Sequence, residues 1–326
     1  MDMKKTTRRN RITVIGPSVV DVLAVPVNFC DLHAGSQPME EIIMSCGGDA
    51  LNEAVILKRL EVDVELISKV GTDQAGNRIM EFLMAEGVSC KGITRDDTVR
   101  TSINIVLVDG KGERYFLTKP GSSLRKLAEQ DIMANLDTEP DIVSFASMFV
   151  SPLLDIASMA RIFRSIKKRP DRILAVDMTK AKNGERLRDL EPILKYIDFI
   201  FPNESEISML TGKKDAYENA RLLVESGVKC AVIKRGGNGC LIYANDEFVD
   251  VPAYPVRKAV DSTGAGDSFV AGFLYGLHSG FTVKECGAFA NAVASCVVEC
   301  LGATHGIGCI EKPYARYKEM MERGQV

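Results

Sequence analysis

The segment that decides both the fold and the chemistry of this chain is DSTGAGDSFVAG, residues 261–272. A strand-like stretch ending near Val256 precedes it, and an apolar helix is expected over Ser268–Leu277. Gly264, Ala265 and Gly266 are small enough for the backbone to turn tightly and to present free N–H groups at the start of that helix. Because unpaired amides and the helix dipole both favour negative charge, the segment predicts an anion site.

Asp267 lies in the first turn of the same helix, where its carboxylate would repel a bound phosphate. A carboxylate is useful there if it takes a proton from the group that attacks the phosphate. The alternative is that Asp267 is only an N-cap and that the glycines form a tight turn. We favour the catalytic interpretation because two acids, Asp261 and Asp267, bracket the small residues.

The composition is that of an ordinary globular protein, and it excludes several kinds of function. The 326 residues include 41 Lys plus Arg and 44 Asp plus Glu, a net charge of −3, and 46% are hydrophobic. Such a balance predicts no nucleic-acid partner. The three histidines, His33, His278 and His305, are scattered and no Cys-x-x-Cys pair is present, so no metal site built from these residues is expected.

Cysteine usage and hydropathy place the chain in the cytoplasm. Nine cysteines without disulfide-like spacing indicate reduced thiols. We expect no membrane segment, since the long apolar stretch Ala288–Leu301 is broken by Asn291 and Glu299. Residues 1–10 are basic and are expected to form a disordered tail rather than a twin-arginine export signal.

Short β-rich apolar runs alternate with segments of helical period, which predicts an α/β fold whose mostly parallel sheet has helices on both faces. The expected strands are Ile12–Ile15, Val64–Val70, Ile142–Phe145, Ile173–Val176, Phe199–Phe201 and Ala231–Lys234. The expected helices are Leu51–Leu60, Gly76–Ala85, Pro152–Lys167 and Tyr217–Glu225. No linker interrupts the pattern, so residues 1–326 are expected to form a single domain.

Two segments depart from this alternation and predict a small accessory sheet. Thr101–Val108 and Glu113–Thr118 flank an Asp-Gly-Lys-Gly turn, as the strands of a β-hairpin would. The segment Val22–Met44 also lacks helical period. Together they would form a lid from segments at about residues 22–44 and 98–120. A pair of surface hairpins is the alternative.

Five motifs, in order along residues 12–308, resemble those of the ribokinase-like (PfkB-type) carbohydrate kinases. Residues 261–272 are similar to the C-terminal signature of that family. The other four are Gly47-Gly48-Asp49-Ala50-Leu51-Asn52, Val70-Gly71-Thr72-Asp73-Gln74-Ala75-Gly76, Pro202-Asn203-Glu204-Ser205-Glu206 and Lys234-Arg235-Gly236-Gly237-Asn238-Gly239. Five motifs in register are a specific signal. The resemblance implies a ribokinase-like, doubly wound α/β fold with a small β-sheet lid.

The resemblance assigns roles to the 261–272 segment and to an acceptor site. Asp267 would be the catalytic base, and the amides of Gly264, Ala265 and Gly266 would stabilise the transferred phosphoryl group. Glycines let main-chain amides approach a polyol, and the side chain of Asn52 both donates and accepts hydrogen bonds. The residues expected to bind the sugar are Asp21, Gly47, Gly48, Asp49 and Asn52.

The nucleotide and metal residues carry weaker signals. Asn203 and Glu206 have the spacing of a capping box before an apolar helix. The resemblance implies that the same two residues orient Mg²⁺-bound water, through Glu206, and the ATP phosphates. It further implies ATP contacts at Asn203, Lys234, Gly236, Gly239 and Asn291, and a monovalent cation such as K⁺ at Asp261 and Thr263. A hairpin turn at the two glycines and a polar helix position at Asn291 are the structural alternatives.

The leading hypothesis is an ATP- and Mg²⁺-dependent kinase that phosphorylates a hydroxyl of a small sugar or sugar-like acceptor. No P-loop is present, and no Gly-x-Gly-x-x-Gly follows the first strand. The alternatives are a nucleoside kinase of the same family and a non-catalytic nucleotide- or sugar-binding regulator. The resemblance also implies a homodimer through the lid sheet.

The identity of the acceptor is left open by the sequence. The residues Gly47–Asn52 have some likeness to 2-keto-3-deoxygluconate kinases. Against that likeness, Asp177-Met178-Thr179-Lys180 departs from the Asp-x-Asn-x-Arg run expected in those enzymes and in fructokinases. The acid at Asp49 favours hydroxyl-rich or cationic acceptors over anionic ones.

Overall fold

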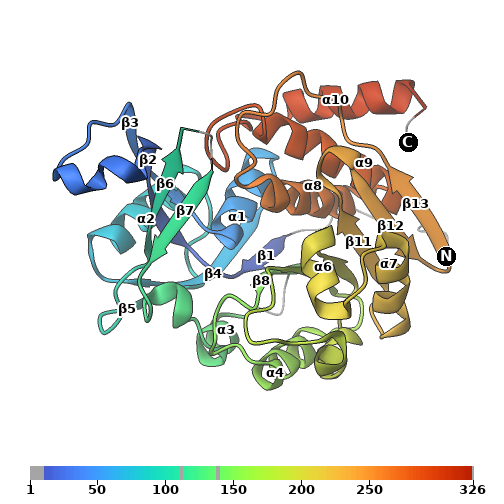
Figure 1. The fold of residues 1–326 in the computed structure, drawn as a ribbon. Coiled ribbons are helices and arrows are strands. Elements are labelled where there is room, and N and C mark those ends of the chain that lie inside the picture. The colour runs from blue at the N-terminus through green and yellow to red at the C-terminus, as the bar shows by residue number, and fades with distance from the viewer. Residues whose placement is uncertain (1–10, 111–112, 137–139, 325–326) are drawn as a thin grey trace.

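The computed structural model describes residues 11–110, 113–136 and 140–324, so the tail expected over residues 1–10 lies outside the described part. The described chain forms a nine-stranded sheet with the order β13-β12-β11-β10-β9-β8-β1-β4-β5 (Figure 1). A separate four-stranded sheet has the order β3-β2-β6-β7. This architecture confirms the predicted α/β fold with a large, mostly parallel sheet and a small accessory sheet.

The strands of the large sheet are short apolar runs, most of them buried on both faces. Their bounds are β1 Ile12–Ile15, β4 Val64–Gly71, β5 Ile93–Asp96, β8 Ile142–Met148, β9 Ile173–Met178, β10 Phe199–Phe201, β11 Cys230–Lys234, β12 Cys240–Ala244 and β13 Glu247–Val251. The strands from β5 to β11 pair in parallel, whereas β12 and β13 pair antiparallel. The six expected strands are present.

The order of the strands reverses at β1, which pairs with β4 on one side and with β8 on the other. The chain first builds the sheet outward to β5, then returns to β8 and continues in the other direction to β13. In open α/β sheets, ligands bind beyond the carboxyl ends of the strands at such a reversal. The ends of β1 at Ile15 and of β8 at Met148 therefore mark the expected position of a site.

Two groups of helices cover the large sheet, and each packs on its own hydrophobic core. One core lies beneath α1, α2, α8, α9 and α10, and the other beneath α3 to α7 (Figure 1). The bounds are α1 Asp49–Arg59, α2 Gln74–Ala85, α3 Glu129–Asn135, α4 Ile156–Ile166, α5 Glu191–Leu194, α6 Glu204–Thr211, α7 Ala216–Glu225, α8 Ala265–Ser279, α9 Val283–Val297 and α10 Glu311–Glu322. None of these described helices is both long and apolar enough to cross a membrane.

One predicted helix boundary is wrong for a local reason. The helix expected over Pro152–Lys167 begins only at Ile156. The carboxylate of Asp155 accepts a hydrogen bond from the amide of Ser158 at 2.8 Å and so caps the helix. An N-cap residue has extended backbone, which places the preceding residues outside the helix.

The strand expected to end near Val256 ends instead at Val251. Pro252 follows, and proline has no N–H with which to continue a β-ladder. Residues 252–264 form an irregular segment that carries the chain from the edge of the sheet to the start of α8. The segment 261–272 is therefore entered from a long loop rather than directly from a strand.

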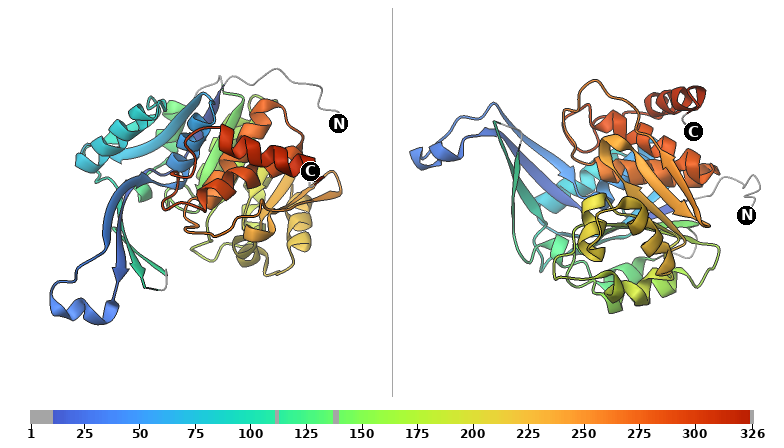
Figure 2. Two further views of the ribbon diagram at one scale, coloured as in Figure 1. Left: turned by 90° about the horizontal axis from the view of Figure 1, so that it is seen from above. Right: turned by 45° about the vertical axis from the view of Figure 1, so that its right-hand side comes forward.

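The accessory sheet consists of β2 Val19–Val27, β3 Glu41–Gly47, β6 Ile103–Asp109 and β7 Arg114–Thr118, with the short helix η1 Phe29–Ala34 between β2 and β3. Figure 2 shows it extending away from the large sheet. The predicted hairpin is present as β6 and β7. The sheet begins before Val22 and continues past Met44, so Asp21 and Gly47 belong to it.

The two faces of the accessory sheet differ in chemistry. Its inner face carries Asp21, whose Oδ1 accepts a hydrogen bond from Nδ2 of Asn104 on the neighbouring strand at 2.9 Å. The outer face is defined by strand register, because neighbouring residues along a strand point to opposite faces. Its exposed apolar side chains are Ile42, Met44, Ile103, Ile105, Tyr115 and Leu117.

The start of α8 requires a glycine at its N-cap. Gly264 has a φ of 71°, in the left-handed region. A Cβ at this position would lie 2.6 Å from the carbonyl oxygen of Ala303. Gly266, two residues later, lies inside the helix, and a Cβ there would lie 3.4 Å from its nearest neighbour, Nζ of Lys234.

These two glycines provide a matched test of the turn. Gly264→Ala should lower the free energy of unfolding by about 1–3 kcal/mol, because alanine is strained at this φ and crowds Ala303. Gly266→Ala should not lower it, since alanine is favoured over glycine within a helix. Urea unfolding followed by circular dichroism measures both. Equal losses in the two variants would contradict this account of the turn.

Candidate active site

The predicted base lies where the N-terminal and C-terminal parts of the chain meet. Nδ2 of Asn52, on α1, donates a hydrogen bond to Oδ2 of Asp267, on α8, at 2.8 Å. Asp49, in the first turn of α1, accepts a hydrogen bond through Oδ2 from the hydroxyl of Ser147 at the end of β8. Three elements at the reversal of the strand order thus bring two carboxylates together.

Both carboxylates hold their protons more tightly than usual. Burial raises the pKa of Asp267 to about 6, although the amide of Asn52 that donates to it works in the opposite direction. Burial also raises the pKa of Asp49 well above its ordinary value, and the nearby charge of Asp267 adds to this effect. The carboxyl group of Asp267 therefore changes its protonation near neutral pH.

The accessory sheet contributes the remaining acceptor residues. A Cβ on Gly47 would lie 2.5 Å from Oδ2 of Asp21 and 3.8 Å from Oδ1 of Asn52. A side chain at position 47 would displace the carboxylate of Asp21, and Gly48 beside it has a φ of 101°, in the left-handed region. The five residues expected to bind the sugar therefore gather around Asp267, on the inner side of the accessory sheet.

The backbone at the start of α8 has a free amide that suits an anion. Among the described residues, the amide of Gly266 has no hydrogen-bond acceptor, whereas that of Ala265 donates to the carbonyl of Ser262 at 3.2 Å and that of Asp267 donates to its own carboxylate. Asp261 stabilises the turn, since its Oδ1 accepts from the amide of Thr263 at 2.8 Å.

Asp261 also joins this turn to a second loop. Its Oδ2 accepts a hydrogen bond from the amide of Gly302 at 2.9 Å. Asp261 is buried, so it holds the two loops together from behind the anion site rather than lining the cavity in front of it. Thr263, the other residue expected at a monovalent cation, lies in the same turn.

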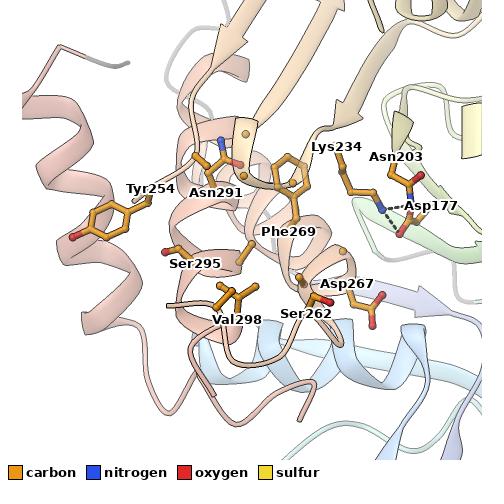
Figure 3. Close-up of a pocket in the computed structure, with 18 of the residues that line it drawn as sticks. Asp177, Asn203, Lys234, Tyr254, Ser262, Asp267, Phe269, Asn291, Ser295 and Val298 are labelled. Carbon is orange, nitrogen blue, oxygen red and sulfur yellow. Dashed lines mark hydrogen bonds and ion pairs between the residues drawn. The ribbon is translucent and has the colours of Figure 1, made fainter. Parts of the chain in front are cut away.

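Lys234 lies close to the anion site and is held there by an acid. Its Nζ contacts both carboxylate oxygens of Asp177, at 2.8 and 2.9 Å, as Figure 3 shows. It also lies 3.4 Å from the position that a Cβ on Gly266 would take. Burial opposes the charge of Lys234, but the carboxylates of Asp177 and Glu206 outweigh it and raise the pKa of the ammonium group.

Asn203 and Glu206 form the capping box that their spacing predicts. Oδ1 of Asn203 accepts from the amide of Glu206 at 2.9 Å, and Oε2 of Glu206 accepts from the amide of Asn203 at 2.8 Å. Both residues also line a large cavity, so capping does not remove them from the site. Burial raises the pKa of Glu206, against the opposing charge of Lys234.

The cavity has a volume of about 550 Å³ and extends from the predicted base to the C-terminal helices. Figure 3 shows Asp267, Lys234 and Asp177 near one end of it and Tyr254 at the other. Residues 262, 265–267 and 291–298 contribute much of its wall. A cavity with an ammonium group, a free amide and carboxylates that can hold a metal ion at one end, and a mostly apolar wall elsewhere, suits a nucleoside triphosphate bound with a metal ion.

The remaining predicted nucleotide residues line this cavity with different contacts. Gly236 and Gly239 have φ values of 55° and 82°. Nδ2 of Asn291 donates to the carbonyls of Val251 and Pro252, at 3.2 and 3.0 Å. Asn291 therefore holds the loop that forms one wall of the cavity, as well as lining it.

Three residues of the site carried no signal that assigned them a role in the sequence. Asp177 is the partner of Lys234, Ser147 holds Asp49, and Asn104 holds Asp21. Asp177 comes at the end of a predicted strand, so its position near a sheet edge could have suggested a site residue. Ser147 and Asn104 have no comparable feature.

Known carbohydrate kinases resemble this chain in sequence and in fold. The model of the pfkB family carbohydrate kinases matches residues 9–308. An uncharacterized sugar kinase of Archaeoglobus fulgidus is 35% identical over 256 residues, which cover 77% of this chain and 97% of that protein. The described fold is also that of solved ribokinases. The Thermotoga maritima ribokinase has a TM-score of 0.77 at 26% identity, covering 94% of this chain and 99% of its own.

A second ribokinase structure, from Arabidopsis thaliana in complex with ribose and ATP, has a TM-score of 0.81 at 22% identity. It covers 95% of this chain and 99% of its own, and at this identity it bears on the fold alone. The family match spans all five motifs, and the structure gathers their residues around Asp267 and one cavity. The chain belongs to the pfkB family of carbohydrate kinases.

Proposed function

We propose that this chain transfers the γ-phosphoryl group of ATP to a hydroxyl of a small sugar or sugar-like acceptor. The observation that carries the proposal is the position of Asp267. Its carboxylate lies between the acceptor residues around Asn52 and the large cavity, beside the amide of Gly266, which has no acceptor among the described residues. A regulator that only binds ligands would not need a base there, and no contact singles out a nucleoside.

The residues divide the work of the transfer between them. The acceptor hydroxyl gives its proton to Asp267 as its oxygen attacks the γ-phosphorus. The new oxygen–phosphorus bond forms while the bond to the β,γ-bridging oxygen breaks, and ADP leaves. The amide of Gly266 and the ammonium group of Lys234 lie where they would stabilise the charge on the transferred group.

Two ions are part of the proposal. The oxygen atoms of Asn203 and Glu206, with Asp177 nearby, suit Mg²⁺ held through water, and the ion would neutralise phosphate charge. A monovalent cation is proposed at the turn of Asp261 and Thr263, whose donors are oxygens. The phosphorylation rate in K⁺ should exceed that in Li⁺, and equal rates would contradict the second site.

The accessory sheet is proposed to act as the lid and as the surface of a homodimer. Its inner face holds Asp21 over the acceptor residues, where closure would exclude water. Its outer face exposes apolar side chains, Ile42 at 68% and Leu117 at 53%, which a second copy would cover. A cytoplasmic location is proposed as well, since the nine cysteines are all free thiols.

Replacing the base tests the mechanism. Asp267→Asn should lower kcat by about 10²- to 10⁴-fold, because general-base help of this size is lost, while ATP still binds. Acceptor turnover and calorimetric ATP binding measure the two effects. In contrast, Asp21→Asn, which changes an acceptor contact, should raise KM for the acceptor more than it lowers kcat. An Asp267→Asn enzyme that works at the unmodified rate would overturn the assignment.

The hydrogen bond from Asn52 should be visible in the pH profile. The base acts when deprotonated, so the rate of the natural enzyme should rise with pH through the pKa of Asp267, about 6. Asn52→Leu removes a donor that favours the carboxylate, so this rise should move to higher pH. Asn104→Leu, which loses a bond to Asp21 instead, is the control and should leave the rise in place. A shift to lower pH in Asn52→Leu would refute the role of Asn52.

The dimer can be tested on the two faces of one hairpin. Ile105→Asp and Leu117→Asp place charges on the outer face and should convert the dimer to monomer. Phe116, the neighbour of Leu117 along β7 and the partner of Val106 on β6, points to the inner face and is 58% exposed. Phe116→Asp should therefore leave the dimer intact. Light scattering coupled to gel filtration gives the mass of each variant, and a monomeric natural protein would exclude the proposed dimer.

A further inference from the structure

A second cavity, separate from the large one, lies beside the turn that follows β8 and holds Asp49. Its volume is about 150 Å³. It lies between the loop after β8, the loop after β9 and the short helix η2 Ser123–Arg125. Among its lining residues are Phe149, Arg125 and Lys182. Because β8 and β9 are parallel neighbours, these loops leave the sheet at the carboxyl ends of the strands, near β1, where the strand order reverses.

A strained turn joins this cavity to the acceptor residues. Ser147 and Phe149 have φ values of 64° and 77°, in the left-handed region that residues other than glycine rarely adopt. Ser147 donates to Asp49, whereas Phe149, two residues later, lines the second cavity. The same turn therefore faces Asp49 on one side and the cavity on the other. Strained backbone of this kind is concentrated at ligand sites.

The acids that line the second cavity have more hydrogen-bond partners than the cations that line it. The acid Asp155 accepts the amide of Ser158, and Glu185 accepts hydrogen bonds from the amide and side chain of Asn183. Both acids are thus engaged locally. The cations are less occupied, as Arg125 donates from Nη1 to the carbonyl of Val150 at 3.1 Å.

Within the described parts of the chain, neither Arg125 nor Lys182 forms an ion pair with a carboxylate. Burial and then the charge of Arg125 lower the pKa of Lys182, while the charge of Asp49 opposes them. Lys182 thus lies within electrostatic reach of Asp49 and of Arg125. Two cations that repel one another at the edge of a sugar site favour an anion between them.

We propose that the acceptor carries an anionic group, a carboxylate or a phosphate, which Lys182 and Arg125 bind in the second cavity while a hydroxyl of the same molecule reaches Asp267. The inference rests on the proposed kinase function and narrows its substrate class. A guanidinium and an ammonium group both form charge-assisted hydrogen bonds with such anions.

The surroundings of Asp49 make it compatible with an anionic acceptor. A charged carboxylate at position 49 would disfavour an anionic acceptor, as the sequence suggests. In the structure, burial and the charge of Asp267 favour the protonated form of Asp49, and its carboxyl group is held by Ser147. The repulsion is thereby reduced, and the ammonium group of Lys182 lies on the side of the second cavity.

Binding of matched probes tests the inference without requiring turnover. Calorimetry without ATP would compare gluconate with glucitol and galactonate with galactitol, pairs that differ in the carboxylate. Glucose 6-phosphate and glucose form the phosphate arm. At least one anionic probe should bind about tenfold or more tightly than its neutral partner, the gain expected of a charge-assisted contact. The arm in which the preference appears identifies the anion.

Three variants locate the preference. Lys182→Gln should remove it, and Arg125→Gln should reduce it, whereas Lys180→Gln, an exposed lysine on the same loop, should keep it. Much of the Lys182 side chain is exposed, although its ammonium group is partly buried, so its replacement leaves the core intact. The inference is overturned if no anionic probe binds better than its neutral partner, or if the preference survives Lys182→Gln.

Failure of the kinase function itself gives a different result. Asp267→Asn should retain the anion preference, because Asp267 contacts the hydroxyl end of the acceptor. A preference that depends on Lys182, found together with no ATP-dependent phosphorylation of any probe or related acceptor, would support the anion site and contradict the kinase proposal. Phosphorylation of neutral sugars alone, with no preference for anions, would support the kinase proposal and contradict the anion site.

Discussion

The hydrogen bond between Asn52 and Asp267 joins parts of the chain that are 215 positions apart. It requires α1 and α8 to lie side by side, so the proposed reaction centre forms only when the N-terminal and C-terminal parts of the chain pack together. The bond also favours the carboxylate form of Asp267, which burial would otherwise protonate. Gly264 serves the same geometry, since its left-handed turn lets α8 begin close to Ala303. One contact therefore contributes both to the packing of the two helices and to the proton affinity of Asp267.

The site gathers more negative than positive side chains around a substrate that is itself an anion. Asp49, Asp177, Glu206 and Asp267 lie around a single buried ammonium group, that of Lys234. Side-chain charge alone would repel ATP, so the attraction must come largely from backbone amides and from a metal ion. This explains how a chain with a net charge of −3 can bind polyphosphate. The amides do not contribute to that sum.

The raised pKa values follow from the same crowding. Burial is the largest cause for Asp49, Glu206 and Asp267, and each also lies within reach of other charged groups. Lys234 lowers all three, but it is already paired with Asp177. A bound cation would lower these pKa values further, because it adds positive charge among the carboxylates. Proton affinity and metal binding at this site are therefore linked.

Much of the fold and part of the site could be predicted from the sequence because their determinants are local. The turn and helix of residues 261–272 are encoded within twelve positions, and the hairpin of β6 and β7 by alternation around a glycine-rich turn. The capping box of Asn203 and Glu206 is equally local. The pair of Asp177 and Lys234 is not, since its members lie 57 positions apart on strands separated by β10.

Backbone strain left no trace in the sequence either. Ser147 and Phe149 adopt left-handed conformations that their residue types do not favour. Such conformations persist only where the surrounding structure imposes them, so they cannot be predicted from local propensity. The second cavity was missed for this reason, because its position depends on where the strained turn directs the chain. Lys182 and Arg125 are ordinary cations in the sequence and acquire a role only through that cavity.

The distribution of charge across the acceptor region also fixes the direction in which an anionic acceptor would lie. Asp267 and Asp49 line the large cavity, whereas Lys182 and Arg125 line the second one. In the reverse orientation, the anionic group would face the carboxylate of Asp267 and leave both cations without a partner, which costs free energy at both ends. The hydroxyl presented to Asp267 would then be one remote from the anionic group. A selectivity for position on the sugar follows from electrostatics alone, before any contact with an individual hydroxyl is considered.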